Sequence, residues 1–522
     1  MRRVLSCGLL LLAIWLPACR DSYWVEEADL AAAEVLKEKS GEFKRFREND
    51  LIMPVGKDDE DDGPTEAELK DVPRIVGLQA ALKVATRFNR TYLSEKESLY
   101  LSALALTTVR NVYSPFFTGS LSAILTDTDA TRRSNINRGR VGVSQILPTG
   151  GTATLEGSTL ITGGNGGGYA GDSVMSLSLD QPLLRDAGYE TSHNALTQAE
   201  RNVVYAIRDF ELFREDFTID VTSRYYSLVR QLREIENSKE EEKSRYFLTR
   251  QSNALFDVGD ASEVDKLRSE REYLRVQNDV ITQTAAFGLS LDRFKILLGL
   301  PTSFPLEILV QDPVYTDIPV SLESAVSAAL NNRLDLLTAR DELEDAEREV
   351  RIASNGTLPD LDLNASYRLT STSRDTLLSQ AFSENFYTLG LTLELPFERV
   401  AERNAFRRSL ITRERSRRAL SLQEDSVVLE VRESIRRVKR VQATLDIRRR
   451  EIVAAEKEQR AARFRFDEGE ADNQDVSVAQ AAVRRARNSY IADLVEFETS
   501  RIQLLRDIGI LFIDEQGMWI EP

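Results

Sequence analysis

The sequence predicts a mainly α-helical protein with a smaller β part. Three observations lead to this prediction: the chain repeats itself in tandem, it contains very long segments without proline or glycine, and it contains short runs in which apolar and polar residues alternate. Charged residues make up 29% of the chain, which is typical of long helices whose outer faces contact water.

The N-terminal residues predict export from the cytoplasm. Two arginines precede an apolar stretch from Val4 to Leu16, which is typical of a signal peptide and short for a transmembrane helix. The next residues, LPAC, are similar to a bacterial lipobox, so we expect 1–19 to be a lipoprotein signal peptide and Cys19 to be lipidated. Ordinary cleavage near Ala18 is the alternative and would leave Cys19 as a free thiol. By resemblance to lipoprotein sorting, Arg20 after the cysteine favours the outer membrane.

The chain is organised as a tandem duplication. The segment FDVGDAS at 256–262 recurs as FDEGEAD at 466–472, and this offset aligns further residues without a gap. A second offset aligns the segment that begins at Leu78 with the one that begins at Leu322. The predicted order is a signal peptide at 1–19, an N-terminal extension at 20–77, a first repeat at 78–302, a linker at 303–321, a second repeat at 322–512 and a tail at 513–522.

Each repeat begins with a helical pattern and continues with two strands. In residues 322–353, leucines and alanines recur at sevenfold spacing, which predicts one coiled-coil-like helix. After Pro359 the period changes to two, and each run has the length of a tilted strand that crosses a bilayer. These two runs are 361–370 and 387–395, and the first repeat echoes them at 117–125 and 175–179, so four strands are expected in all. A soluble β-sandwich would show the same alternation in any single run.

The segment VGVSQILPTGGTATLEGSTL at 141–160 makes the connection between the strands of the first repeat unusually long. It would form either an extra hairpin or an extended external loop, and the sequence leaves both open. The glycine-rich run at 163–171 that follows lacks the Lys-Ser/Thr pair of a phosphate-binding turn, so it predicts a plain loop.

Long polar helices are predicted after the second strand of each repeat. Residues 189–256 and 405–466 contain no proline or glycine, and the latter segment would span roughly 90 Å as a helix. Each helix leads to the glycine of the repeated motif, where glycine tolerates the left-handed backbone that ends a helix. A second helix then follows in each repeat, so two long helical hairpins are expected.

Catalysis and nucleic-acid binding find little support. The formal net charge of −16 provides no positive field for phosphates. The one histidine, His193, has no second histidine or usable cysteine with which to build a base or zinc site, so we expect a surface helix residue. No enzyme activity, cofactor or metal site is expected.

The chain resembles the TolC-type outer-membrane efflux protein family, and within it an outer-membrane factor lipoprotein. The resemblance rests on an ordered set of features: the lipobox-like cysteine, the duplicated helix–strand–strand–helix–helix units, the proline that closes each second strand and the F-x-x-G turns. The resemblance covers about 78–512. It implies a homotrimer in which each protomer gives four strands to one transmembrane β-barrel and coiled-coil helical hairpins to a periplasmic tunnel.

The resemblance also implies function and partners. The chain would be the outer-membrane channel of a tripartite efflux or type I secretion system, spanning and lipid-anchored in the cell outer membrane. It would conduct substrates passively from a periplasmic membrane-fusion adaptor and an inner-membrane transporter of RND or ABC type. Outer-membrane lipid is a further expected partner, and nucleic acid is not. The main alternative is a lipid-anchored periplasmic coiled-coil scaffold that does not span the outer membrane.

Site residues follow from the matching positions. The resemblance assigns adaptor docking to the hairpin tips, at Gly259, Asp260, Ala261, Gly469, Glu470 and Ala471. It assigns a periplasmic gate to Asp475, where three carboxylates near the axis would repel each other and attract cations. The alternative is that Asp472 and Asp475 cap a helix. In the first repeat Asp265 has the equivalent place, and we expect Arg268 to pair with it.

The segment 399–450 contains 16 basic and 7 acidic residues. We expect these side chains to form ion pairs between helices, with acidic stretches such as KEEEK at 239–243. A tunnel lining that favours anionic cargo and a nucleic-acid patch are the alternatives. The acidic run KDDEDDGP at 57–64 is expected to be solvated and flexible.

Overall fold

The computed structural model describes residues 21–40, 64, 66–127, 133–164, 170–313, 321–373, 382, 384–514 and 517–520. The predicted signal peptide with Cys19 and the acidic residues of the run at 57–64 lie outside the described residues. The chain divides into two compact units. The sheet unit comprises 1–46, 99–207 and 338–421, and the hairpin unit comprises 47–98, 208–337 and 422–522.

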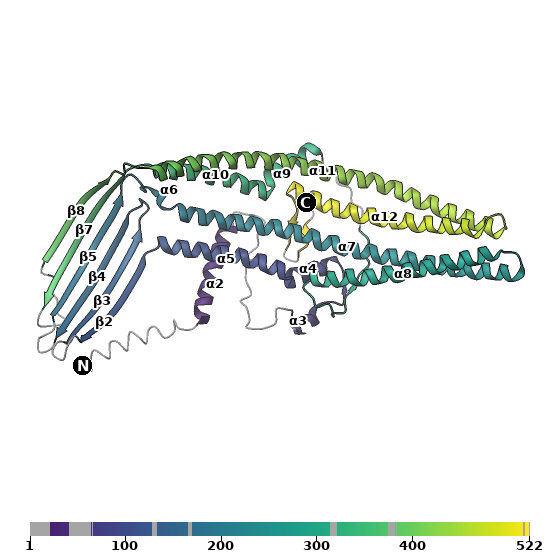
Figure 1. Cartoon of the computed structure of the whole chain (residues 1–522), viewed down its shortest axis with the longest axis horizontal. Helices are drawn as coiled ribbons and strands as arrows, with labels where there is room; N and C mark the ends of the chain where they lie inside the picture. The colour runs from purple at the N-terminus through teal and green to yellow at the C-terminus, as the bar shows by residue number, and fades with distance from the viewer. Residues whose placement is uncertain are drawn as a thin grey trace. The chain divides into compact units, whose positions relative to one another are not determined.

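The sheet unit contains one antiparallel sheet of six strands in the order β2-β3-β4-β5-β7-β8 (Figure 1). The strands are β2 (Phe116–Asp127), β3 (Arg133–Ile146), β4 (Thr152–Gly164), β5 (Ala170–Pro182), β7 (Asp360–Ser373) and β8 (Glu384–Glu394). The expectation of four strands was therefore wrong. The segment 141–160 forms most of the β3–β4 hairpin, which is the first of the two structures that the sequence left open, and the glycine-rich run extends β4 and β5 at its two ends.

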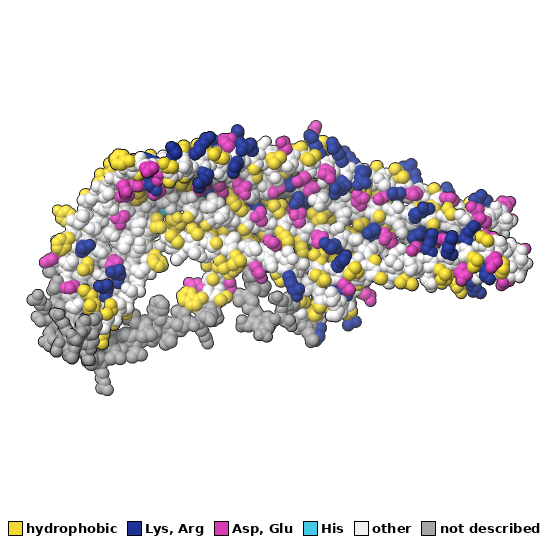
Figure 2. Space-filling model, viewed as in Figure 1, with side chains coloured by type: hydrophobic (Ala, Val, Ile, Leu, Met, Phe, Trp, Pro, Cys, Tyr) yellow, Lys and Arg dark blue, Asp and Glu magenta, His cyan; other side chains and the backbone are white. Residues whose placement is uncertain are grey.

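The two faces of the sheet differ in polarity. Residues paired in register lie on the same face, so Leu121, Val141, Leu155 and Leu389 share one side, which we call the apolar face. Several of its apolar side chains are strongly exposed, among them Leu121 at 89% and Leu389 at 73%, and Figure 2 shows hydrophobic side chains among the strands. The opposite, polar face carries mainly serine, threonine and charged residues. The predicted alternation is confirmed, and an exposed apolar face is typical of a surface that contacts another protein or a membrane.

Helices pack together next to the sheet within the same unit. The extension begins as α2 (Asp21–Ser40), whose side chains Ala32, Val35 and Leu36 are buried. Arg110 of α5 (Arg90–Tyr113) forms ion pairs with Glu38 of α2 at 2.9 Å and with Glu200 of α7 (Asn194–Val258) at 3.2 Å. The extension therefore starts as a docked helix on α5 and α7.

His193 follows the short helix α6 (Tyr189–Ser192) and is buried. Its ring lies 4.5 Å from those of Tyr113 and Tyr189, and its Nδ1 lies 2.8 Å from the Ser192 hydroxyl. The expectation of a surface residue was wrong because two tyrosine rings enclose the imidazole. The residue packs between aromatic rings beside the sheet.

The hairpin unit contains the larger part of the two predicted helical hairpins (Figure 1). One is formed by α7 and α8 (Glu263–Leu297), and the other by α11 (Val400–Asp467) and α12 (Asn473–Ile508). Helices α7 and α11 are 65 and 68 residues long, so the prediction of very long helices is confirmed. None of the helices in the described ranges has an apolar stretch long enough to cross a bilayer.

Short elements complete this unit. Strand β1 (Ile75–Val76) pairs in parallel with β6 (Glu307–Ile308), which lies in the predicted linker. The predicted tail forms a small hairpin of β9 (Phe512–Ile513) and β10 (Trp519–Ile520). Arg214 of α7 donates to the Asp514 carbonyl at 2.9 Å, so the hairpin is docked on α7. The remaining short helices of the unit are α3 (Glu66–Asp71), α4 (Leu78–Phe88) and α9 (Leu322–Asn332).

The first helix of each repeat is broken at a matched position. The sequence predicts one helix over 322–353, but α9 ends before Arg333 and α10 (Leu334–Asn355) follows it. In the first repeat α4 and α5 are broken in the same way at Asn89. The Asn89 amide donates to the Leu297 carbonyl at 2.7 Å and accepts from the Tyr92 amide at 2.8 Å. Such contacts with other elements stabilise a break that the heptad pattern does not indicate.

Candidate functional site

The two hairpin tips have the same backbone structure. Gly259 and Gly469 have φ angles of 90° and 78°, the left-handed region that glycine enters without strain. The Gly259 amide donates to the Phe256 carbonyl at 3.0 Å, and the next amide, of Asp260, donates to Leu255 at 2.8 Å. These two bonds are the Schellman motif that ends a helix.

The second tip repeats the motif residue for residue. Gly469 donates to the Phe466 carbonyl at 3.1 Å and Glu470 donates to Arg465 at 2.8 Å. At both tip glycines, no atom outside the glycine and its two chain neighbours lies within 4 Å of the position of an added β-carbon. Asp260 and Glu470 are exposed, whereas Ala261 and Ala471 are half-buried. The six predicted docking residues therefore lie together in two solvent-exposed turns of matching shape.

The helix that follows the first tip is capped by a serine. Ser262 accepts from the Asp265 amide at 3.2 Å, and its hydroxyl donates to the Asp265 carboxylate at 2.6 Å. Arg268 lies 3.6 Å from that carboxylate, so the predicted pair is confirmed.

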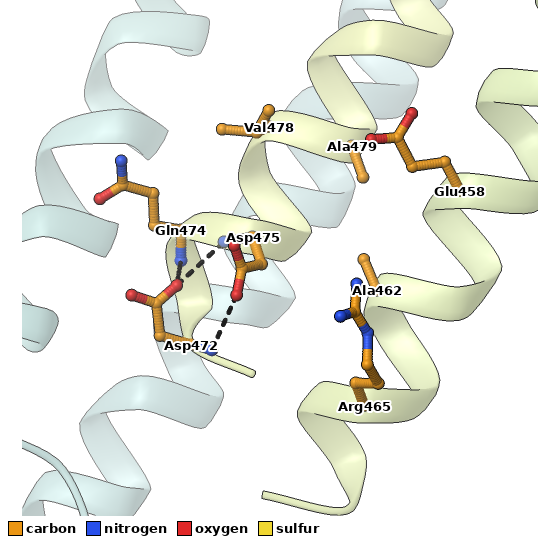
Figure 3. Close-up of a pocket in the computed structure, with 8 residues that line it drawn as sticks. All are labelled: Glu458, Ala462, Arg465, Asp472, Gln474, Asp475, Val478 and Ala479. Carbon is orange, nitrogen blue, oxygen red and sulfur yellow. Dashed lines mark hydrogen bonds between the residues drawn. The ribbon is translucent and has the colours of Figure 1, made fainter. Parts of the chain in front are cut away.

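The helix that follows the second tip begins with a capping box (Figure 3). The Asp472 carboxylate accepts from the amides of Gln474 and Asp475 at 2.8 and 3.0 Å, and the Asp475 carboxylate accepts from the Asp472 amide at 3.4 Å. Such a box satisfies amides that have no partner inside the helix. The capping alternative therefore describes the local structure of Asp475, and a gate at this residue stays a prediction.

A polar pocket of about 390 Å³ lies beside Asp475, between α11 and α12. Figure 3 shows Glu458, Ala462 and Arg465 of α11 across from the first turns of α12. The pocket is lined by Glu458, Ala462, Arg465, Asp472, Gln474, Asp475, Val478 and Ala479. Three carboxylates against one guanidinium make it an acidic pocket, which favours cations over anions.

A buried polar seam that the sequence did not reveal joins the two hairpins near their tips. Asn473 of α12 donates to the Ser252 hydroxyl of α7 at 2.7 Å. Farther along, Arg245 forms an ion pair with Glu241 at 3.0 Å and donates to the Ser477 carbonyl at 2.8 Å. Charged residues are rarely buried unless they are paired, and here Glu241 pairs with the buried Arg245.

The basic segment 399–450 forms ion pairs, as expected. Arg440 and Arg448 of α11 lie 2.5 and 2.9 Å from Glu496 and Asp493 of α12. The stretch 239–243 differs in its partners, because its ion pairs to another helix run to Arg484 and Arg487 of α12. Figure 2 shows side chains of both signs along the helices. Interhelix ion pairing is thus confirmed, with α12 as the partner on both sides.

Comparisons with known proteins agree with this architecture. Residues 325–509 match the family model described as outer membrane efflux protein. A search of curated proteins finds no match to the chain.

Among solved structures, the outer-membrane channel OprN matches at a TM-score of 0.63 and 15% identity, over 88% of this chain and 99% of that chain. The CmeC outer membrane channel of Campylobacter jejuni matches at 0.63 and 17%, over 88% and 91% of the two chains. The outer membrane protein VceC of Vibrio cholerae matches at 0.63 and 14%, over 83% and 96%. At identities this low, the likeness shows a shared fold and no more.

The predicted fold class, mainly helical with long hairpins and a β part, is confirmed by these structures. The efflux family is one of passive outer-membrane channels and not of enzymes, in agreement with the expectation from the sequence. Residues 325–509 match the sequence pattern of the outer membrane efflux protein family, and the chain has the fold of the outer-membrane channels OprN and CmeC, in agreement with the resemblance to the TolC-type family.

Proposed function

We propose that this chain is the outer-membrane channel of a tripartite efflux or type I secretion system, and that it conducts substrates passively to the outside. The observation that carries the proposal is the sheet with its exposed apolar face and its two edges, β2 and β8, which have no further strand beside them in the described part of the chain. An open sheet edge is not tolerated in lipid. Pairing β2 of one copy with β8 of the next removes both edges.

A homotrimer is the proposed closed assembly, by resemblance to the family. Its barrel would span the outer membrane with the apolar face toward lipid, and its helical hairpins would extend into the periplasm. Lipidation of Cys19 would add an anchor to the same membrane. The scaffold alternative is disfavoured because a soluble protein rarely exposes a continuous apolar face of this size.

The hairpin tips are the proposed contact for a periplasmic membrane-fusion adaptor, which would in turn contact an inner-membrane transporter. The support is their exposure: the turns at Gly259 and Gly469 make no packing contact at the glycine itself. Crosslinkers placed at Glu470 should capture the adaptor, and crosslinkers at Tyr100, in a part of α5 that packs against α2, should not.

Asp475 is the proposed periplasmic gate. Its capping bonds leave it exposed at the rim of an acidic pocket, so three copies near a common axis would attract cations. Changing Asp475 to Asn should reduce the cation preference of reconstituted channels. The matched control is Asp265→Asn in the first repeat, which should leave this preference unchanged. An equal effect of both variants would contradict a specific role for Asp475.

The channel itself is tested by fractionation and reconstitution. Outer-membrane fractions should contain a trimer that dissociates on heating, and the purified trimer should conduct ions across planar bilayers. A spin label on Leu389→Cys should report a lipid environment. A monomer without conductance and with a water-exposed label would instead support the periplasmic scaffold.

A further inference from the structure

We infer that the β3–β4 hairpin is part of the barrel wall, so that each copy contributes six strands and the barrel opens wider than the resemblance implies. This inference rests on the proposed function, because it requires the sheet to close in a trimer. Six strands from each of three copies give eighteen in all, whereas the four strands expected from the sequence would give twelve. The evidence comes from the pairing, the two faces and the turn of the hairpin.

The pairing is continuous over the full length of the hairpin. Strand β3 pairs with β2 from Phe116↔Ser144 to Asp127↔Arg133, and with β4 from Ser134↔Gly164 to Ile146↔Thr152. Strand β4 then pairs with β5 as far as Thr162↔Ala170. A hairpin that lay outside the barrel as a loop would leave β2 and β5 to pair directly, and here β3 and β4 separate them completely.

The faces of the hairpin follow those of the surrounding sheet, with Asn137, Gln145 and Thr159 as polar exceptions on its apolar face. Val141 and Leu155 lie on the apolar face and are 66% and 38% exposed. Val141 is paired in register with Gly119 of β2, and Leu155 with Leu177 of β5. The charged side chains described in the hairpin, Arg138, Arg140 and Glu156, all lie on the polar face. The apolar exceptions on that polar face are Ile136, Ile146 and Leu160.

An ion pair crosses the polar face between the two strands of the hairpin. The Arg140 guanidinium lies 3.2 Å from the Glu156 carboxylate. A charged pair is costly on a lipid-facing surface and acceptable in a water-filled lumen. The hairpin therefore has the orientation of a wall element, with its ion pair toward the lumen and its valine and leucine toward lipid.

The turn of the hairpin is fixed to the segment that links β5 to α7. The Gly188 amide donates to the Thr149 carbonyl at 2.9 Å, and the Gln181 amide donates to the same oxygen at 3.0 Å. At Gly150, which has a φ of 92°, an added β-carbon would lie 2.5 Å from the Asp186 carbonyl oxygen. These close contacts hold the turn at the helical end of the sheet, level with the ends of the other strands.

The added strands change the width of the opening. Barrel diameter grows about linearly with strand number, so eighteen strands at a spacing of about 4.8 Å and a tilt of about 40° enclose roughly 36 Å, against roughly 24 Å for twelve. Barrels of 16–18 strands leave an aqueous channel even with side chains inside. The outer mouth of this channel would therefore admit larger solutes.

Spin labels on single cysteines of the reconstituted trimer test the wall position, with the unsubstituted chain and its Cys19 as background. Labels at Val141→Cys and Leu155→Cys should be accessible to oxygen dissolved in lipid, like the reference Leu389→Cys on β8. A label at Ser158→Cys should be accessible to a water-soluble nickel chelate, like the reference Thr388→Cys.

The references separate the two proposals. If Leu389→Cys contacts lipid but Val141→Cys and Leu155→Cys contact water, the hairpin lies outside the wall and this inference is overturned while the channel stands. If Leu389→Cys itself contacts water, the channel proposal is overturned and the inference with it.

Removal of the hairpin tests the width. Deleting residues 133–164 joins β2 to β5 with unchanged direction and leaves four strands per copy. Neutral polymers added on the outer side should enter the parent barrel up to a radius at least 1.5 times larger than in the deletion variant. Equal exclusion limits in two stable trimers would overturn the widening. If the deletion variant does not assemble, the labels alone decide.

Discussion

The two ends of the hairpin helices use the same glycine motif in opposite surroundings. At the tips, Gly259 and Gly469 have positive φ angles and open space around them. At the other ends, Gly299 and Gly509 both have a φ of 76°, but each packs against a helix break. An added β-carbon at Gly299 would lie 2.0 Å from the Phe88 carbonyl oxygen, and one at Gly509 would lie 3.1 Å from the Arg333 amide.

This difference separates two reasons for glycine. All four positions need a residue that tolerates a left-handed backbone. Only Gly299 and Gly509, which we call the inner glycines, also need the absence of a side chain. The inner glycines let α8 and α12 end directly against the breaks at Asn89 and Arg333. The inner ends thus determine how the helices pack, while the tips are left free for contact with another molecule.

The largest effect is expected at the tightest contact. Gly299→Ala combines a left-handed backbone with a backbone clash, so we expect destabilisation by about 3 kcal/mol or more. The thermal dissociation of the proposed trimer and the resistance of the protein to trypsin would measure this loss. The control is Gly288→Ala in the middle of α8, where nothing lies within 4 Å and alanine should stabilise the helix by up to about 1 kcal/mol. Similar stability of both variants would contradict the packing role.

The next largest effect concerns the two breaks. Arg333 is buried and its guanidinium contacts Asp335 at 2.7 Å and Glu430 at 2.5 Å. Arg333→Ala should lower the free energy of unfolding by about 2–3 kcal/mol. This is less than the loss expected on breaking a fully buried ion pair, because both carboxylates are partly exposed. The matched variant Asn89→Ala loses two neutral hydrogen bonds and should cost about 1–2 kcal/mol. The same stability assay checks the order, and a smaller loss for Arg333→Ala would contradict it.

Two aspartates of the hairpin unit predict opposite dependences on pH. Burial works to raise the pKa of Asp335, but hydrogen bonds and charge from Arg333 outweigh it and lower the pKa below its ordinary 3.8. Its contribution to stability is present above that value and is lost as the pH falls through the lowered pKa. Burial raises the pKa of Asp507 despite hydrogen bonds from Ser434 and Gln503. Ionisation of Asp507 therefore costs stability, and this cost appears as the pH rises above 3.8.

The two substitutions should consequently have opposite signs at pH 7. Asp335→Asn should destabilise the protein and Asp507→Asn should stabilise it. Both differences should shrink at low pH. The cost at Asp507 disappears as the pH falls through its raised pKa toward 3.8, and the contribution of Asp335 is lost as the pH falls from 3.8 through its lowered pKa. Thermal dissociation measured between pH 3 and 7 gives the curves. A stabilisation by Asp507→Asn that does not change with pH would contradict the assignment.

Local signals were predictable and long-range contacts were not. The glycines of the repeat were found from the sequence because a left-handed helix end depends on the glycine and its nearest neighbours. The breaks at Asn89 and Arg333 were missed because their stabilising partners, Leu297 and Glu430, lie far away in the chain. The β3–β4 hairpin was left undecided because alternation in one strand does not show what lies beside it.

The smallest effect on stability is expected at the tips. In Gly469→Ala the added β-carbon meets no neighbour. Only the left-handed backbone is then unfavourable, by about 1 kcal/mol, and this strain is confined to an exposed turn. Thermal dissociation should be nearly unchanged, in contrast to Gly299→Ala. If the tips bind the adaptor as proposed, the altered turn should nevertheless weaken co-purification of the adaptor. Unchanged binding together with an altered turn would place the contact elsewhere on the hairpins, whereas a large loss of trimer stability would show that the tip glycines, too, are packing positions.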